Sequence, residues 1–321
     1  MRCLLFLTLF AAACATAQVP PVVPVEPVRR KAILEETALV GDTVLKMGVE
    51  SGRENDHGRD TRVFTVPIAC GDAKTNFTWG CGGQTILSAG FADKARVEIH
   101  PNEDLKLIVD GEGKPLFLGD ATVEIILGGK PYPTTAWIMR DGQFNKNVPG
   151  VIGYEIAKKF QWEVDPRVPQ ITLRALGTAP KKKVLATLPL KDDQDNFWVH
   201  VKVRGAEDDV TIMPQTPDFQ VSPEMQKTWD VMRGDKQPDD VKTYLGNLRV
   251  LSLRGKDGIT LNGDIFETNF VAYLLPEGPN SRSAIGQSLL NRFVYSVDAS
   301  KKEMVLIERV PVAVSQPVKA R

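Results

Sequence analysis

The sequence predicts an all-β protein of two duplicated lobes, each with a short helix. Two observations carry this prediction. The phrase from 151 to 173 returns without a gap from 284 to 306, so that Ile152 corresponds to Ile285 and Phe160 to Phe293 at one constant shift. Short apolar and alternating runs fill much of the remaining chain, without the regular exchange of strand and helix patterns that marks a parallel α/β sheet.

The repeat extends to positions with structural meaning. Gly153 is matched by Gly286, and Asp165 by Asp298, at the shift that takes position 152 to 285, which we call the repeat shift. This period is far too long for a solenoid, so the repeating unit is a whole lobe. We therefore expect a pseudo-twofold axis that relates Gly153 to Gly286.

Length and composition suit two folded units. A chain of 321 residues with 42% hydrophobic and 25% charged residues can bury a sizeable core. Lys plus Arg equals Asp plus Glu at 40 each, which gives no electrostatic reason to expect nucleic acid or an anionic membrane as partner. The oligomeric state is not indicated by the sequence.

The N-terminal segment has the pattern of an export signal. Residues 1–17 combine Arg2, an apolar stretch too short to span a bilayer, and small residues before a cleavage site after Ala17. A secreted or periplasmic protein is expected, with a lipid anchor at Cys14 as a weaker alternative. The expected divisions are a signal peptide at 1–17, a Pro-rich linker at 18–35, a first lobe at 36–177, an interlobe linker at 178–194, a second lobe at 195–309 and a tail at 310–321.

Turn residues divide the two lobes into short segments. Helical patterns are confined to 153–160, 223–233 and 286–293. Strands are expected in the first lobe at 63–70, 76–81, 97–101, 105–111, 121–129 and 134–139, and in the second at 196–205, 208–213, 248–255, 258–263 and 270–275.

Two cysteines lie outside the signal segment. Cys70 and Cys81, on either side of a turn sequence, are expected to face each other across a hairpin and form a disulfide in an oxidising compartment. Two buried free thiols are the alternative. Neither a metal site nor a cofactor is expected, because His57, His100 and His200 are scattered without ligand spacing.

The order of these segments resembles a family. A hairpin, a loop, a second hairpin and an apolar-apolar-Gly element that opens a short helix look like a lobe of the aspartic proteases of the retropepsin and pepsin type, over 60–173 and 195–307. The resemblance implies a bilobal, pepsin-like architecture, with a flap hairpin at Gly128 and Gly129.

The same resemblance implies two Asp-Thr/Ser-Gly turns, which this sequence lacks. Two neighbouring carboxylates share a proton and act as base toward water and acid toward the peptide. Gly80 stands in place of the first Asp, and Met213, its counterpart at the repeat shift, in place of the second. The candidate residues of the binding cleft are Gly80, Cys81, Gly82, Gly83, Met213, Pro214, Gln215 and Thr216.

Other acids do not occupy symmetric turn positions. Asp72, Asp93 and Asp218 are interpreted as loop or cap residues. Asp165 and Asp298 are symmetric, but they follow the helix and are expected to brace a strand turn.

The function predicted is therefore binding without catalysis. We expect an exported aspartic-protease-like protein that holds a peptide or protein segment between its lobes, where strands offer backbone groups. An active aspartic endopeptidase with unorthodox acids is the alternative. Motifs of other hydrolases and of nucleotide-binding proteins are absent, and nothing brings His100 or His200 near Cys81 to form a Cys-His pair.

Overall fold

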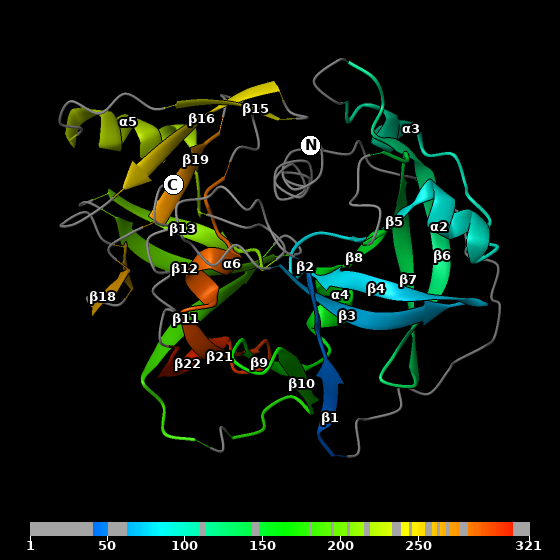
Figure 1. Cartoon of the computed structure of the whole chain (residues 1–321), viewed down its shortest axis with the longest axis horizontal. Helices are drawn as coiled ribbons and strands as arrows, with labels where there is room; N and C mark the ends of the chain where they lie inside the picture. The colour runs from blue at the N-terminus through cyan, green and yellow to red at the C-terminus, as the bar shows by residue number, and fades with distance from the viewer. Residues whose placement is uncertain are drawn as a thin grey trace, which may run out of the picture.

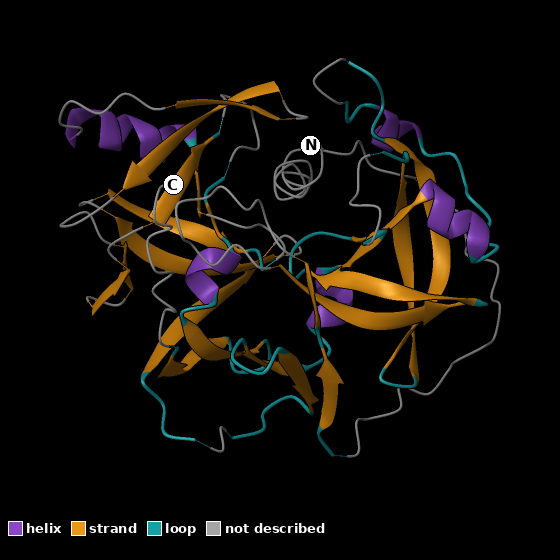
Figure 2. Cartoon of the chain, viewed as in Figure 1, coloured by secondary structure: helices purple, strands orange, loops and turns teal. Residues whose placement is uncertain are grey.

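Strands dominate the part of the chain that the structure describes. The computed structural model shows two groups of strands with short helices at their margins (Figure 2). Among the described residues no helix is long and apolar enough to cross a bilayer. The described residues are 41–50, 63–109, 113–142, 148–179, 182–193, 196–203, 206–214, 219–232, 239–243, 246–253, 259–261, 264–267, 270–275 and 282–310.

The first lobe is a seven-stranded sheet that closes on itself. Its strands follow the order β2-β3-β4-β8-β5-β7-β6, and an additional pairing of β3 with β6 closes the barrel. Long strands alternate buried and exposed residues, as in β6, because one face of the sheet packs on the core. The elements are β2 (Gly48–Glu50), β3 (Val63–Cys70), β4 (Ala73–Trp79), β5 (Thr85–Ser88), α2 (Ala89–Lys94), α3 (Glu103–Lys106), β6 (Phe117–Leu127), β7 (Lys130–Met139), β8 (Gly150–Ile152) and α4 (Tyr154–Ala157).

The second lobe uses a related set of elements. Its strands follow the order β11-β12-β13-β20-β14-β19-β16-β15, β17 pairs with β12, and β18 pairs with β17 (Figure 1). The elements are β11 (Ala186–Asp193), β12 (Asn196–Val203), β13 (Ala206–Ile212), β14 (Phe219–Val221), α5 (Pro223–Met232), β15 (Asp239–Thr243), β16 (Gly246–Leu253), β17 (Ile259–Leu261), β18 (Asp264–Glu267), β19 (Phe270–Leu274), β20 (Ala284–Ile285) and α6 (Gln287–Leu290).

The two lobes repeat the same pairings at the repeat shift. β4 runs parallel to β8 with Thr78 opposite Val151, and β13 runs parallel to β20 with their repeat counterparts, Thr211 and Ala284, opposite each other. Helices α4 and α6 keep the same shift, but each has only four residues and is shorter than its predicted segment. The all-β, bilobal prediction is confirmed.

The segments that contain the paired turns differ in length by one residue between the lobes. Ser88 accepts a hydrogen bond from the amide of Phe91 and begins α2, and Ser222 does the same for Met225 at the start of α5. The repeat shift takes position 88 to 221, so Ser222 lies one position beyond the strict counterpart of Ser88. The segment between β13 and α5 therefore holds one more residue than the segment between β4 and α2.

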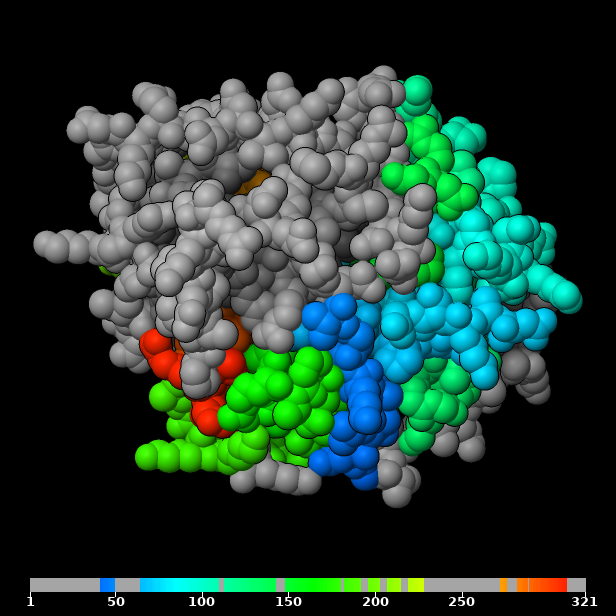
Figure 3. Space-filling view, viewed as in Figure 1, coloured from blue at the N-terminus to red at the C-terminus, as the bar shows by residue number. Residues whose placement is uncertain are grey.

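A central row of strands joins the lobes. It runs β1-β10-β9-β21-β22-β11, and β9 pairs antiparallel with β21. Glu163 lies opposite Ser296, its own counterpart at the repeat shift, so the pseudo-twofold axis passes through this pair. Figure 3 shows β1, in blue, at the surface beside the green segment that includes β10. The strands are β1 (Thr43–Lys46), β9 (Gln161–Asp165), β10 (Gln170–Arg174), β21 (Phe293–Asp298) and β22 (Glu303–Arg309).

Three large aromatic side chains fill the core at this axis. The ring centroid of Trp162 lies 5.8 Å from that of Trp79 and 5.9 Å from that of Tyr295, both in edge-to-face geometry. Trp162 and Tyr295 are counterparts in the repeat, and both are completely buried. The hydroxyl of Tyr295 has no hydrogen-bond partner among the described residues.

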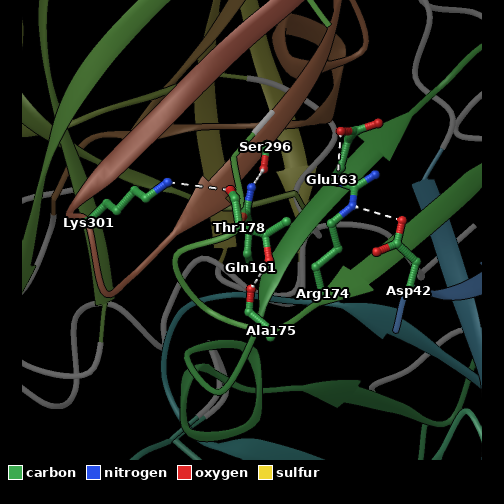
Figure 4. A network of polar contacts seen from close by, with 8 residues as sticks. All are labelled: Asp42, Gln161, Glu163, Arg174, Ala175, Thr178, Ser296 and Lys301. Atoms are coloured by element: carbon green, nitrogen blue, oxygen red, sulfur yellow. Dashed lines mark hydrogen bonds and ion pairs between the residues drawn. The ribbon is translucent and has the colours of Figure 1, made fainter. Parts of the chain in front are cut away.

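Polar contacts brace the same row of strands (Figure 4). Arg174 of β10 is buried, and its guanidinium contacts Glu163 at 2.9 Å and Asp42 at 3.2 Å. The amide of Gln161 donates to Ser296 across the lobe boundary at 3.3 Å. A buried Arg is tolerated because carboxylates satisfy its donors.

Three expectations about elements need correction. Residues 97–101 form no strand, and 105–111 begin within α3, because Asn102 caps that helix by accepting from Asp104 and Leu105. The segment 178–194, predicted as a linker, includes β11, whose edges pair with β12 and β22. The alternating apolar residues of 97–101 and 105–111 suggested strands, whereas the Lys-rich and Pro-containing start of 178–194 suggested a linker.

Replacing the axial rings by smaller groups tests the shared core. We expect Trp162→Ala to lower the free energy of unfolding by about 3–5 kcal/mol, because it leaves a large cavity. Tyr295→Phe is the matched control, since it keeps the ring and removes only a hydroxyl without a partner; its unfolding free energy is expected to stay within about 1 kcal/mol of the native protein. Urea denaturation measures both, and a large loss in Tyr295→Phe would contradict this packing.

Candidate functional site

The two turns that carry the candidate site face each other across the lobe boundary. One follows β4 and contains Gly80 and Cys81; the other follows β13 and begins at Met213. The thiol of Cys81 donates to the main-chain carbonyl of Ile212 at 2.8 Å. Ile212 directly precedes Met213, so the structure brings together the two positions that the repeat shift pairs.

Glycine permits a second contact between the lobes. Gly82 forms an antiparallel bridge with Asn196, the first residue of β12. A Cβ on Gly82 would collide with the amide oxygen of Asn196 and would touch the methyl group of Thr211 at 3.7 Å. The turn can approach the second lobe this closely only because residue 82 has no side chain.

A hydrogen bond within the first lobe also holds the turn that contains Gly80 and Cys81. The carbonyl of Gly83 accepts a hydrogen bond from the amide of Tyr154, the first residue of α4, at 2.8 Å. The Tyr154 ring in turn packs on Phe197 of β12, with ring centroids 4.9 Å apart. Gly83 has a φ of +67°, a conformation that favours glycine.

The contact between the turns cannot be reciprocal. The repeat shift places Pro214 opposite Cys81 in the alignment of the two lobes. Proline has neither an amide hydrogen nor a side-chain donor, so the second lobe cannot return the bond that Cys81 makes. Within the described residues the turns are thus joined asymmetrically, by the Cys81 thiol of the first lobe.

The paired positions carry no ionisable oxygen. Gly80 has no side chain, and Met213 is completely buried with Ala284 as its apolar neighbour. Burial raises the pKa of the Cys81 thiol well above its usual range, so this group stays neutral at physiological and acidic pH. Burial, with a smaller contribution from Cys81, likewise raises the pKa of Tyr295 well above its usual range. These groups cannot exchange a proton as a carboxylate pair does.

Two of the alternative acids lie at the far end of the first hairpin. Asp72 is in the turn between β3 and β4, seven residues before Trp79, a separation of roughly 20 Å along a strand. Gly71, in the same turn, packs closely on the residue that follows α2, because a Cβ on Gly71 would lie 2.7 Å from the carbonyl oxygen of Ala95. The end of α2, which contains Asp93, therefore lies near this turn. Gln215, Thr216 and Asp218 lie outside the described residues.

The expected disulfide is absent. Cys70 and Cys81 are both free and buried. The hairpin turns at once after Cys70, which faces Ala73, whereas Cys81 lies beyond the opposite end of β4. The two sulfurs are separated by about the length of that strand, and a disulfide requires Cα atoms within about 7 Å. The error came from placing the hairpin turn midway between the cysteines.

The candidate flap glycines occupy a different environment from the turns. Gly128 and Gly129 form the connection between β6 and β7, and both have positive φ, as a tight hairpin turn requires. A Cβ on Gly128 would meet the side chains of Thr43 and Leu45 in β1. This packing against the central row of strands argues against a free lid at this hairpin.

The symmetric aspartates brace local turns. Asp165 accepts three hydrogen bonds from Arg167, from its backbone amide and its guanidinium, at 2.8–3.1 Å. Asp298 accepts from the amides of Gly177 and Ser300 and from the Ser300 hydroxyl. Their partners are structural, in keeping with the interpretation drawn from sequence.

The histidines lie apart from the turns in the described structure. His200 is exposed on the β12–β13 hairpin, where Nδ1 lies 3.1 Å from Asp209 and Nε2 lies 3.7 Å from Glu207. His100 forms a backbone bridge with Asp120. No cluster of ligands suited to a metal ion occurs among the described residues, and His57 lies outside them.

Sequence reasoning missed two residues beside the turn. Asn196 makes the bridge to Gly82, and Glu155 in α4 accepts a hydrogen bond from the amide of Thr85, directly after the turn. Glu155 had a recognisable signal, because it is an acid in the otherwise apolar "VIGYEIA" segment. Asn196 had none, since its role depends on how the lobes are docked.

Comparison with known proteins finds a likeness among solved structures at low sequence identity. No family model and no curated protein matches the chain. Among solved structures, basic 7S globulin from soybean is similar over 84% of this chain and 95% of its own, with 10% identity and a TM-score of 0.46. A similarity at this level does not establish an activity.

The thiol contact between the turns can be tested by substitution. We expect Cys81→Ala to lower the free energy of unfolding by about 1–3 kcal/mol more than Cys81→Ser, because Ser keeps a donor for the Ile212 carbonyl and Ala leaves this acceptor without it. Cys70→Ala and Cys70→Ser form the matched control pair. Equal losses for Ala and Ser at position 81 would exclude a structural role for the bond.

The state of the cysteines gives a second test. In a chain that begins at residue 18, denaturation without reductant should expose two thiols that iodoacetamide alkylates, whereas the folded protein should react slowly because both are buried. Mass spectrometry counts the adducts. A mass two hydrogens lower with no adducts would restore the disulfide.

Proposed function

We propose that this chain is an exported, aspartic-protease-like binding protein that holds an extended peptide or protein segment without cleaving it. One observation carries the proposal. The turns after β4 and β13 are docked through the Cys81 thiol and the Ile212 carbonyl, yet the paired positions hold Gly80 and Met213. The arrangement of a two-lobed acid protease is present, and its proton-sharing acids are missing.

The chemistry of peptide hydrolysis explains why this difference is decisive. Aspartic-protease chemistry needs one ionised and one protonated carboxyl group at the centre. A methionine thioether and a glycine can neither activate water nor protonate the leaving amine. Loss of general acid-base catalysis alone removes about 10²- to 10⁴-fold in rate, roughly 3–5 kcal/mol, and loss of the activated water adds to this.

A binding role is compatible with what surrounds the turns. Extended peptides commonly bind by pairing their main-chain groups with those of strands at a sheet edge, and both turns follow strands. The binding site we propose comprises Gly80–Gly83 and the 213–216 turn. Export rests on the pattern of residues 1–17, which precedes the described structure.

The hydrolysis test uses the purified protein and denatured protein substrates from about pH 3 to 7, the acid range in which carboxylate pairs work. We expect no cleavage that a transition-state-mimicking aspartic-protease inhibitor abolishes. Asp218→Asn is the informative variant, because this acid adjoins the second turn. Inhibitor-sensitive cleavage that disappears in Asp218→Asn would establish the endopeptidase alternative.

The binding test uses a library of extended peptides that carry a photoreactive group. We expect crosslinks at 80–84 and 213–218, mapped by mass spectrometry, and competition by the same peptides without the group. Crosslinks spread over the surface, or confined to the β12–β13 hairpin, would contradict a site at the turns.

A further inference from the structure

Glu155 connects the candidate site to two other elements of the first lobe. It is the second residue of α4, and its Oε1 atom accepts hydrogen bonds from the amide of Thr85 and from the hydroxyl of Thr134, each at 3.0 Å. Thr85 is the first residue after the turn, and Thr134 lies in β7. One carboxyl oxygen therefore joins the end of the turn to α4 and β7.

The other carboxyl oxygen is in a poor environment for a charge. Oε2 of Glu155 is buried and has no hydrogen-bond partner among the described residues. Gly153 packs closely against the Gln84–Thr85 peptide. A Cβ on residue 153 would collide with that peptide and with the Oε2 atom of Glu155. An ionised carboxylate with one buried, unbonded oxygen is costly.

The groups around Glu155 do not neutralise its charge. Burial is the largest cause that raises its pKa, and hydrogen bonds from Thr85 and Thr134 oppose the rise. β5 carries no titratable side chain. On β7 the titratable residues are Lys130 and Tyr132, and the Tyr132 ring packs on Phe160. On α4 the other titratable residue is Tyr154, and the ammonium group of Lys158 lies 4.8 Å from the centroid of its ring. The two donors to Oε1, the amide of Thr85 and the hydroxyl of Thr134, are neutral.

The second lobe lacks this arrangement. Ser288 is the counterpart of Glu155 at the repeat shift, and Phe219 occupies the first position of β14, where the first lobe has Thr85 in β5. The carboxyl contact is thus specific to the turn that donates the Cys81 thiol.

We propose that Glu155 holds the end of the 80–84 turn in a proton-dependent way, an arrangement that we call the latch. When Glu155 is protonated, at mildly acidic pH, its carboxyl group holds the turn, and when it is ionised the turn is released. The latch thereby regulates ligand binding at this turn. Protonation on Oε2 leaves Oε1 as a carbonyl-type acceptor for both donors and buries no charge. Ionisation favours rotation of the side chain toward water, which frees the amide of Thr85. The regulatory part of this inference rests on the proposed binding function.

The sign of the effect on stability follows from linkage. The folded state holds the proton of Glu155 more tightly than the unfolded chain does, since its folded pKa is raised. The contribution of protonated Glu155 to the free energy of unfolding is therefore fully present below the ordinary Glu pKa of about 4.3. This contribution is lost as the pH rises through the pKa of Glu155 in the folded state. Glu155→Gln, which is always neutral, removes this dependence.

Hydrogen exchange of the unliganded protein tests the latch directly. After correction for intrinsic rates, protection of the Thr85 amide should fall in the native protein as the pH rises above the ordinary Glu pKa of about 4.3, stay level in Glu155→Gln, and be low throughout in Glu155→Ala. Glu98→Gln, at an exposed carboxylate of the same lobe, is the matched control and should follow the native profile. The same profile in native protein and Glu155→Gln would overturn the latch.

Peptide affinity at pH 5 and pH 7.5 tests its regulatory consequence. Affinity of the photoreactive peptides should depend on pH in the native protein and lose that dependence in Glu155→Gln. Equal pH dependence in both proteins refutes regulation by Glu155, even if exchange shows the latch. Absence of peptide binding in every variant refutes the proposed function and its regulation, while the exchange profile still decides the latch.

Discussion

The pairing of β9 with β21 is the constraint on which the rest of the structure depends. Each lobe contributes one strand, and Glu163 faces its own repeat counterpart Ser296. This register places Trp162 and Tyr295 against each other in the core. Because β4 and β13 pair at fixed positions with β8 and β20, just before α4 and α6, the same axis also sets the two turns opposite each other.

The docked turns form a buried centre without charged side chains in the described residues. A carboxylate pair needs solvent or hydrogen bonds to compensate buried charge. Here the corresponding space is occupied by Met213, a neutral thiol at Cys81 and a glycine that accepts the close approach of Asn196. Such a centre needs no compensation for charge, and it contributes packing, the hydrogen bond from Cys81 to Ile212 and the bridge between Gly82 and Asn196.

The repeat has diverged unequally in its two halves. The first turn is fastened by Cys81, by the Gly82 bridge and by the Glu155 contact, whereas the second contains Pro214, which lacks a donor, and one extra residue before α5. In the described residues, a ligand at the first turn would meet a segment that these contacts hold in place. The proposed latch acts on this turn.

The sequence by itself determined the repeat, the all-β class and the absence of acids at Gly80 and Met213, because these depend on residue identity and on a constant spacing. Strand patterns and the repeated apolar-apolar-Gly segment are local signals, and they located β4, β13, α4 and α6. The short elements β5, β8, β14 and β20 were not among the expected strands. Only the tertiary structure decided that Cys70 and Cys81 lie at opposite ends of β4, that Gly128 packs on β1, and that Glu155 reaches Thr85. Those outcomes depend on strand length, register and the docking of distant segments, which no local pattern encodes.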